Sequence, residues 1–289
     1  MDHGDRIEDA LKAALVRVTA DRCPPKLASA LDYALFPGGA RVRPRLCLAV
    51  AAACGDDAPQ LADAAASSIE LLHCASLIHD DLPCFDDAET RRGKPSVHRA
   101  YGEPLAVLAG DALIVAAFET LGLGIAIDCR RSAGLISIVA RAVGGPTGIV
   151  AGQAWECEDS IPMDEYHQAK TGSLFSAATM AGALAAGAEP EQWRTLGERL
   201  GESYQIADDI CDLVADPGER GKPIGRDRDL GRPNAAGALG VSGALGRLRA
   251  LLEEAVASVP DCPGKAALSE HILTSAQPYL PKQISRVAA

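Results

Sequence analysis

LLHCASLIHDDLPCFDD, residues 71–87, is an apolar stretch at helical spacing that runs directly into four aspartates. We interpret Leu71–His79 as the end of a buried helix. The four carboxylates, which begin at Asp80 and Asp81 and end at Asp86 and Asp87, repel one another unless positive charge lies between them. Acidic side chains at the C-terminal end of a helix also oppose its dipole, which argues against a merely solvated helix end. The stretch therefore predicts a buried helix that presents hard oxygen ligands.

A second acidic cluster, Asp208, Asp209 and Asp212, follows the half-apolar segment Tyr204–Ala207. On a helix Asp208 and Asp212 stack at positions i and i+4, a like-charge pair that is unfavourable when isolated. Carboxylate oxygens are the ligands that magnesium prefers when it is bound together with substrate phosphates. Two such clusters predict a site for magnesium and a diphosphate.

The composition favours an all-α fold. Of 289 residues, 48% are hydrophobic but only 4% are aromatic, and alanine and leucine are strong helix formers. No repeat or charged linker divides the chain, so we predict one domain over residues 1–289, with a long polar loop at Gly218–Pro233. Apolar residues recur at helical spacing in Ile7–Val18, Lys26–Phe36, Pro44–Cys54, Leu61–His79, Pro104–Leu123, Ala133–Val143, Gly148–Glu156, Tyr166–Ala186, Glu191–Val214, Val241–Val259 and Lys265–Tyr279.

Charge and hydropathy exclude several other classes. The net charge of −11 argues against a nucleic-acid partner. The acidic first twenty residues do not form a signal peptide, and the longest clean apolar run, Leu46–Cys54, is shorter than the roughly 20 residues of a membrane span. Nine cysteines without a C-x-x-C pair fit buried thiols in a reducing compartment. We expect a cytoplasmic protein.

Basic residues suited to a diphosphate lie before, between and after the acidic clusters. Arginine can grip a phosphate with two hydrogen bonds, whereas lysine acts as a point charge. Any one of these residues could be an ordinary surface cation, and only the set indicates a site. The set comprises Arg41, Arg43, Arg91, Arg92, Lys170 and Lys222.

Taken together, these residues resemble the head-to-tail (trans) isoprenyl diphosphate synthases, and most of all the bacterial geranylgeranyl diphosphate synthases of carotenoid and bacteriochlorophyll pathways. HDDLPCFDDAETRRGKPSVH at 79–98 and YQIADDICD at 204–212 are similar to the two aspartate-rich motifs of that family. PGGARVRP at 37–44, GQAWE at 152–156, AKTGSLF at 169–175 and GKPIGRD at 221–227 are similar to its other blocks, in family order.

The resemblance implies a homodimeric helical bundle of the isoprenoid synthase type I fold around a deep central cavity, together with roles for named residues. Asp80, Asp86 and Asp208 would bind three magnesium ions (manganese can substitute), with Asp81, Asp209 and Asp212 completing or orienting the sites. Arg91, Lys170 and Lys222 would hold an allylic diphosphate, with Thr171 and Gln205 nearby. Isopentenyl diphosphate would be gripped by Arg43, His73 and Arg92, with Arg41 close by.

The chain departs from the family's pattern at the isopentenyl site, among other places. The family usually has a lysine that contacts isopentenyl diphosphate where this chain has Ala40. An alternative interpretation is a class I terpene cyclase, which binds metal ions in the same way but needs no isopentenyl site. A regulatory subunit of a heteromeric synthase usually loses its aspartate motifs, and both are intact here.

Product length should depend on the helix that ends at Asp80. Ser76 and Ala75 lie four and five residues earlier, roughly 6–7.5 Å along the helix, and both are small. Leu72 and Leu71, about one turn deeper, can form a floor to the cavity. This arrangement predicts a twenty-carbon product, geranylgeranyl diphosphate, with farnesyl diphosphate as the alternative. Small residues could instead serve only to pack helices closely.

Overall fold

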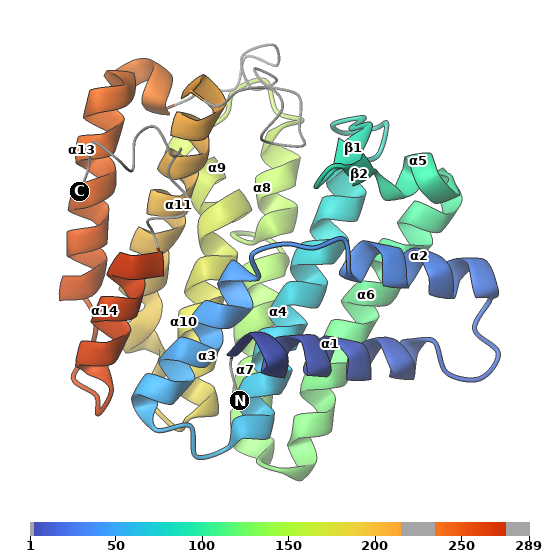
Figure 1. Cartoon of the computed structure of the whole chain (residues 1–289), viewed down its shortest axis with the longest axis horizontal. Coiled ribbons are helices and arrows are strands. Elements are labelled where there is room, and N and C mark those ends of the chain that lie inside the picture. The colour runs from blue at the N-terminus through green and yellow to red at the C-terminus, as the bar shows by residue number, and fades with distance from the viewer. Residues whose placement is uncertain (1–2, 215–234, 276–289) are drawn as a thin grey trace.

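The computed structural model describes residues 3–214 and 235–275, and these residues form a bundle of helices with one short β-ribbon (Figure 1). The predicted all-α fold is confirmed, since the structure is 76% helical with almost no strands. The elements are α1 (His3–Val18), α2 (Pro25–Leu35), α3 (Val42–Cys54), α4 (Pro59–Asp80), β1 (Thr90–Arg91), β2 (Lys94–Pro95), α5 (Val97–Tyr101), α6 (Glu103–Leu123), η1 (Gly124–Ala126), α7 (Cys129–Val143), α8 (Ile149–Trp155), α9 (Met163–His167), η2 (Gln168–Gly172), α10 (Ser173–Ala185), η3 (Pro190–Trp193), α11 (Arg194–Val214), α13 (Ala235–Ala257) and α14 (Lys265–Ser275).

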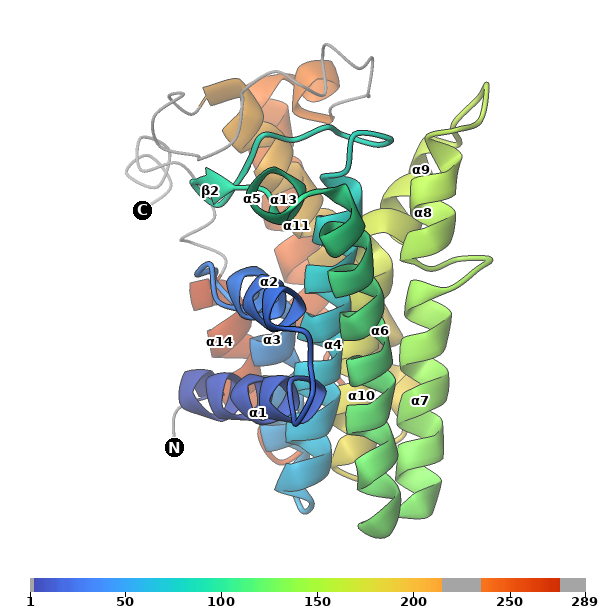
Figure 2. The same cartoon turned by 90° about the vertical axis from the view of Figure 1, so that its right-hand side faces the viewer.

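Helix α4 lies at the centre of the bundle because it is apolar on nearly every side. It begins at Pro59, whose missing N–H costs nothing in the first turn. It packs against α1, α3, α6 and α10, and the view in Figure 2 shows α4 behind α6 and beside α10. This burial fixes the direction in which the end of α4 presents Asp80.

Within the described residues, two helical stretches are long and apolar enough to cross a membrane by length and composition alone, namely α4 and Glu103–Ala126. The apolar window of α4 is 72% buried, as expected of a core helix, whereas that of Glu103–Ala126 is only 44% buried. The cores of soluble proteins contain such helices too, so the expected lack of a membrane span stays a prediction.

One end of the bundle, uppermost in Figure 1, gathers the end of α4, the β1–β2 ribbon, α8, α9 and the last turns of α11. Here the chain departs from the continuous helix expected over Tyr166–Ala186, because a π-helical turn, η2, separates α9 from α10. The turn lies close to α8 on one side and α11 on the other, at Gly152 and Gly201. Single π turns of this kind are frequent at functional sites.

Candidate functional site

The first acidic cluster is a compact loop at the end of α4. The N–H of Asp86 donates to the carbonyl of Asp80 over 3.0 Å, and the N–H of Asp87 donates to that of Leu82 over 3.0 Å. These backbone bonds fold the loop back, so that Asp86 returns to the end of the helix that carries Asp80. The sequence prediction that both belong to one site agrees with this geometry.

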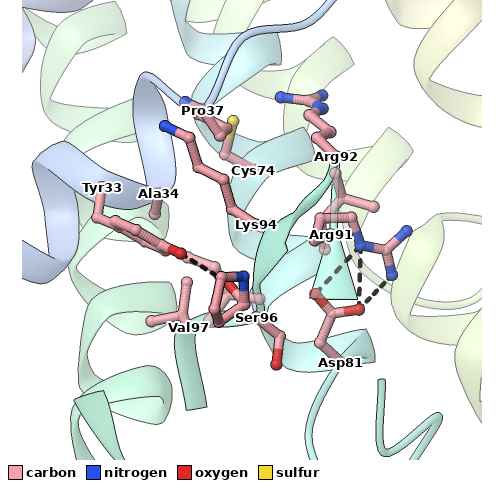
Figure 3. Close-up of a pocket in the computed structure, with 13 residues that line it drawn as sticks. Tyr33, Ala34, Pro37, Cys74, Asp81, Arg91, Arg92, Lys94, Ser96 and Val97 are labelled. Atoms are coloured by element: carbon pink, nitrogen blue, oxygen red, sulfur yellow. Dashed lines mark hydrogen bonds and ion pairs between the residues drawn. The ribbon is translucent and has the colours of Figure 1, made fainter. Parts of the chain in front are cut away.

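Arg91 faces this cluster from the β-ribbon. Its Nε donates to both carboxylate oxygens of Asp81, over 3.0 and 3.1 Å (Figure 3). Its Nη2 lies 4.0 Å from Asp80 Oδ2. Burial disfavours the charged form of Arg91, but hydrogen bonding and attraction by Asp81, with further attraction by Asp80 and Asp86, raise the pKa of Arg91 above its ordinary value. Arg91 therefore stays charged at the first cluster, and Asp81 orients it.

Lys170 reaches the same cluster from η2. Its Nζ lies 3.5 Å from Asp80 Oδ1 and also contacts Glu156 Oε1. The hydroxyl of Tyr166 donates to that same glutamate oxygen over 2.5 Å. Neither Glu156 nor Tyr166 was predicted as a site residue, and the one signal for Glu156 in the sequence is its place at the end of the GQAWE block.

Thr171, the next residue of η2, is linked to the second cluster. Its hydroxyl donates to Gln205 Oε1 over 2.9 Å, and Gln205 Nε2 donates to Asp209 Oδ1 over 3.0 Å. Asp209 is buried and Asp208 is half-buried. Adjacent residues of one turn therefore connect to both acidic clusters. The side chain of Asp212 lies outside what the structure describes, as does all of Lys222.

The residues expected to bind isopentenyl diphosphate fall into two groups. Arg43 on α3 lies 3.4 Å from His73 on α4, measured from Nη1 to Nε2, and its guanidinium packs 4.7 Å from the centre of the Phe175 ring. Arg92 donates to the carbonyl of Gly38 over 2.7 Å. Arg92 and Gly93 form the two-residue turn of the ribbon, with φ values of 53° and 75°.

This turn lets Arg91 and its neighbour Arg92 point in different directions, one towards Asp81 and the other away from it (Figure 3). The pocket drawn there lies between α2, α4 and the ribbon, and includes Pro37, Cys74 and Lys94. Ala40 is exposed.

Arg41, which the sequence also predicted to lie at the isopentenyl diphosphate site, points its side chain into the bundle. Its side chain is 5% exposed, and its three nitrogens donate to Glu8 over 2.9 Å, to Glu70 over 2.7 Å and to the carbonyl of Leu35 over 2.6 Å. Its backbone is left-handed, with φ 49°, at the start of α3. Each of its three nitrogens is already bonded to a group of the bundle, so Arg41 ties α1, α2 and α4 together from a buried position.

The residues expected to set product length lie on two sides of α4. Ala75 and Leu72 are each 1% exposed. Ser76 is half-buried, and its hydroxyl donates to the carbonyl of His73 over 2.8 Å. By helical geometry Ser76 lies on the side of α4 that carries Asp80, and Ala75 lies about 100° further round.

The donor chemistry at this end of the bundle fits a hard divalent cation. Asp80, Asp86 and Asp208 offer only carboxylate oxygens. Among the described residues no three acidic, histidine or cysteine side chains already converge on one point. A hard divalent cation can be held by one or two carboxylates together with substrate phosphates rather than by a complete protein cage.

A helical bundle that gathers two aspartate clusters and several cations at one end defines a class of protein, the all-α isoprenoid synthases. Comparison with known proteins then places the chain more closely. The polyprenyl synthetase family matches residues 24–267. The chain therefore belongs to the polyprenyl synthetase family, whose members are prenyltransferases that generally use a divalent metal.

Individual relatives agree with this placement. The chain is 55% identical over 280 residues, 97% of each chain, to a geranylgeranyl diphosphate synthase of Cereibacter sphaeroides. It is 52% identical, over 92% of each chain, to a geranylgeranyl diphosphate synthase of Rhodobacter capsulatus. A geranyltransferase of Helicobacter pylori, solved with magnesium and isoprenyl diphosphate, superposes with a TM-score of 0.77 at 29% identity, over 95% of this chain and 97% of that one.

Proposed function

We propose that the protein condenses isopentenyl diphosphate with an allylic diphosphate (dimethylallyl, geranyl or farnesyl) and makes mainly geranylgeranyl diphosphate. One observation carries the proposal: Lys170 contacts Asp80 of the first acidic cluster, and its neighbour Thr171 connects through Gln205 to Asp209 of the second. A diphosphate bound at this turn would lie between both clusters. The two bacterial relatives named as geranylgeranyl diphosphate synthases support the product.

The described residues can perform the reaction, with one set for each of the two diphosphate substrates. Lys170 and Arg91 hold the allylic diphosphate and stabilise the negative charge that grows on it as its bond to carbon breaks. Arg43, His73 and Arg92 hold the diphosphate of the isopentenyl substrate, whose double bond attacks the allylic carbocation. A proton is then lost, and the departing diphosphate is its acceptor. The apolar bundle keeps water from the cation.

We propose magnesium as the metal, with three ions per site and manganese as a substitute. Asp80, Asp86, Asp208 and Asp212 would hold it, and when bound it neutralises charge on the diphosphate leaving group. The hard oxygen donors favour this choice, and magnesium is named in the solved Helicobacter pylori relative.

Product analysis tests the function. The protein, magnesium, isopentenyl diphosphate and each allylic diphosphate are incubated, and the products are separated by chain length. We expect twenty carbons from the wild type, and fifteen from Ala75→Tyr because the ring fills space needed by the last isoprene unit. Ser76→Phe is the companion variant, since Ser76 is the less buried of the two. A fifteen-carbon wild-type product would contradict the proposal, as would unchanged products from both variants.

We also propose a cytoplasmic homodimer that supplies precursors for carotenoids. Leu108, Val115 and Leu123 recur at seven- and eight-residue spacing on α6, and they are 53%, 68% and 54% exposed. Such a line of large apolar side chains is typical of an interaction surface, and a second copy of the chain is the occupant we propose. Light scattering should give twice the monomer mass for the wild type and the monomer mass for Val115→Glu. A monomeric wild type would contradict this part of the proposal.

A further inference from the structure

Three side chains meet at one oxygen behind the first acidic cluster. Glu156 Oε1 accepts from Tyr166 Oη over 2.5 Å and from Lys170 Nζ. The Tyr166 ring also lies 5.8 Å from Nζ, measured to its centroid. Tyr166 is buried, and the side chain of Glu156 is 13% exposed. The contacts are therefore made with little competition from water.

The three residues come from separate elements. Glu156 follows the last turn of α8, Tyr166 lies on α9, and Lys170 lies on the π turn η2. A lysine side chain is a flexible point charge that has no preferred geometry of its own. Here the ammonium has a carboxylate on each side, Glu156 in contact and Asp80 at 3.5 Å. Its position therefore depends on where Glu156 is held.

Tyr166 holds that glutamate. A buried tyrosine needs a partner for its hydroxyl, and the partner here is the same oxygen that Lys170 contacts. When Lys170 turns to a phosphate, the phenol continues to donate to Glu156, so the carboxylate keeps a hydrogen bond in a place where losing its partners would be costly. Glu156 thus holds Lys170 before the diphosphate binds, and the release of Lys170 from Glu156 costs little free energy.

We infer that Glu156 and Tyr166 are positioning residues for Lys170, which fix its ammonium for the allylic diphosphate; the inference rests on the function proposed above. Neither needs to touch the substrate. The isopentenyl diphosphate group of residues, Arg43, His73 and Arg92, lies on other elements. The effect of losing the phenol should therefore be specific to one of the two substrates.

The main experiment is steady-state kinetics of Tyr166→Phe, which removes only the hydroxyl. The KM for the allylic diphosphate should rise about five- to tenfold, the size of one ordinary hydrogen bond, because the phenol acts on Lys170 only through Glu156. The KM for isopentenyl diphosphate should stay within about twofold. Tyr101→Phe is the matched control, because its hydroxyl pairs with Ser29 over 3.0 Å and not with a residue assigned to either cluster, and it should change neither constant.

A double-mutant cycle separates positioning from a purely structural role. In a Lys170→Ala background the phenol has no lysine to position, so adding Tyr166→Phe should leave the allylic KM unchanged. Calorimetric binding of inorganic pyrophosphate with magnesium gives a second readout, which Tyr166→Phe should weaken by the same five- to tenfold in the wild-type background.

Three outcomes would overturn the inference: an unchanged allylic KM, an equal rise for both substrates, or the same rise with and without Lys170. Failure of the proposed function would give a different result: the wild type would bind pyrophosphate but would not lengthen any prenyl diphosphate. Melting temperatures of all variants show whether each one is folded.

Discussion

Gly152→Ala should displace the turn that carries Lys170. A Cβ at position 152 would lie 2.6 Å from the backbone N of Lys170 and 2.7 Å from its Cα, whereas ordinary contact begins at 3.4 Å. To restore ordinary contact, the turn or helix α8 must move by the difference between 3.4 and 2.6 Å, which is 0.8 Å. Because the obstructing atoms are backbone, no side-chain rotation can relieve the clash.

The expected loss follows from that displacement. A misplacement of about 1 Å can cost roughly 100-fold in rate, so we expect kcat/KM for the allylic diphosphate to fall about 30- to 100-fold. Overpacking of this kind also costs about 1–3 kcal/mol of stability. Kinetics with the allylic substrate varied, together with thermal unfolding followed by circular dichroism, would measure both effects.

The chain offers a matched control for this substitution. Gly246 lies on α13 with nothing within 4 Å of a built Cβ, so Gly246→Ala should leave activity unchanged and gain up to about 1 kcal/mol of helix propensity. If Gly152→Ala kept kcat/KM within about threefold of the wild type, contrary to the 100-fold scale above, the contact between α8 and η2 would not be what places Lys170.

Three further predictions concern the metal, the isopentenyl site and the core. Asp80→Ala and Asp208→Ala should each lower kcat more than tenfold, about 1.4 kcal/mol in the barrier, while circular dichroism stays that of the wild type; a smaller loss would remove that residue from the metal ligands. Ala40→Lys should lower the KM for isopentenyl diphosphate, since one added charged contact is worth about 1–2 kcal/mol, and should leave the allylic KM unchanged. A raised KM for isopentenyl diphosphate would count against the proposed isopentenyl site. Arg41→Met should cost about 3–5 kcal/mol in urea unfolding because it strands the buried carboxylate of Glu70, and a selective rise in isopentenyl KM at unchanged stability would restore Arg41 to the substrate site.

The amino-acid sequence alone determined the fold class and the acidic ends of two helices. These features are local: apolar residues at helical spacing define α4, and Asp80 and Asp86 are separated by a few residues whose backbone folds back on itself. Asp208 and Asp209 likewise follow an apolar stretch of α11. Short-range patterns of this kind can be interpreted without knowing which elements pack together.

Which cations serve the site was decided only by the tertiary structure. Arg41 and Arg43 are two residues apart in one motif, yet Arg41 is bonded to Glu8 and Glu70 while Arg43 lies beside His73. The difference depends on helices α1 and α4, which are distant in sequence and come together only in the packed bundle. A basic residue shows its charge in the sequence, whereas its partner is fixed by packing.

The same reason explains the residues that sequence reasoning missed. These are Glu156 and Tyr166, which meet at Lys170. Tyr166 and Lys170 are four residues apart and would share a face of any helix, but Glu156 lies 10 and 14 residues away from them along the chain. Glu156 reaches Lys170 because the end of α8 packs against η2, with Gly152 of α8 close to the backbone of Lys170. The local sequence shows a lysine; the shared carboxylate oxygen that holds it exists only once the bundle has folded.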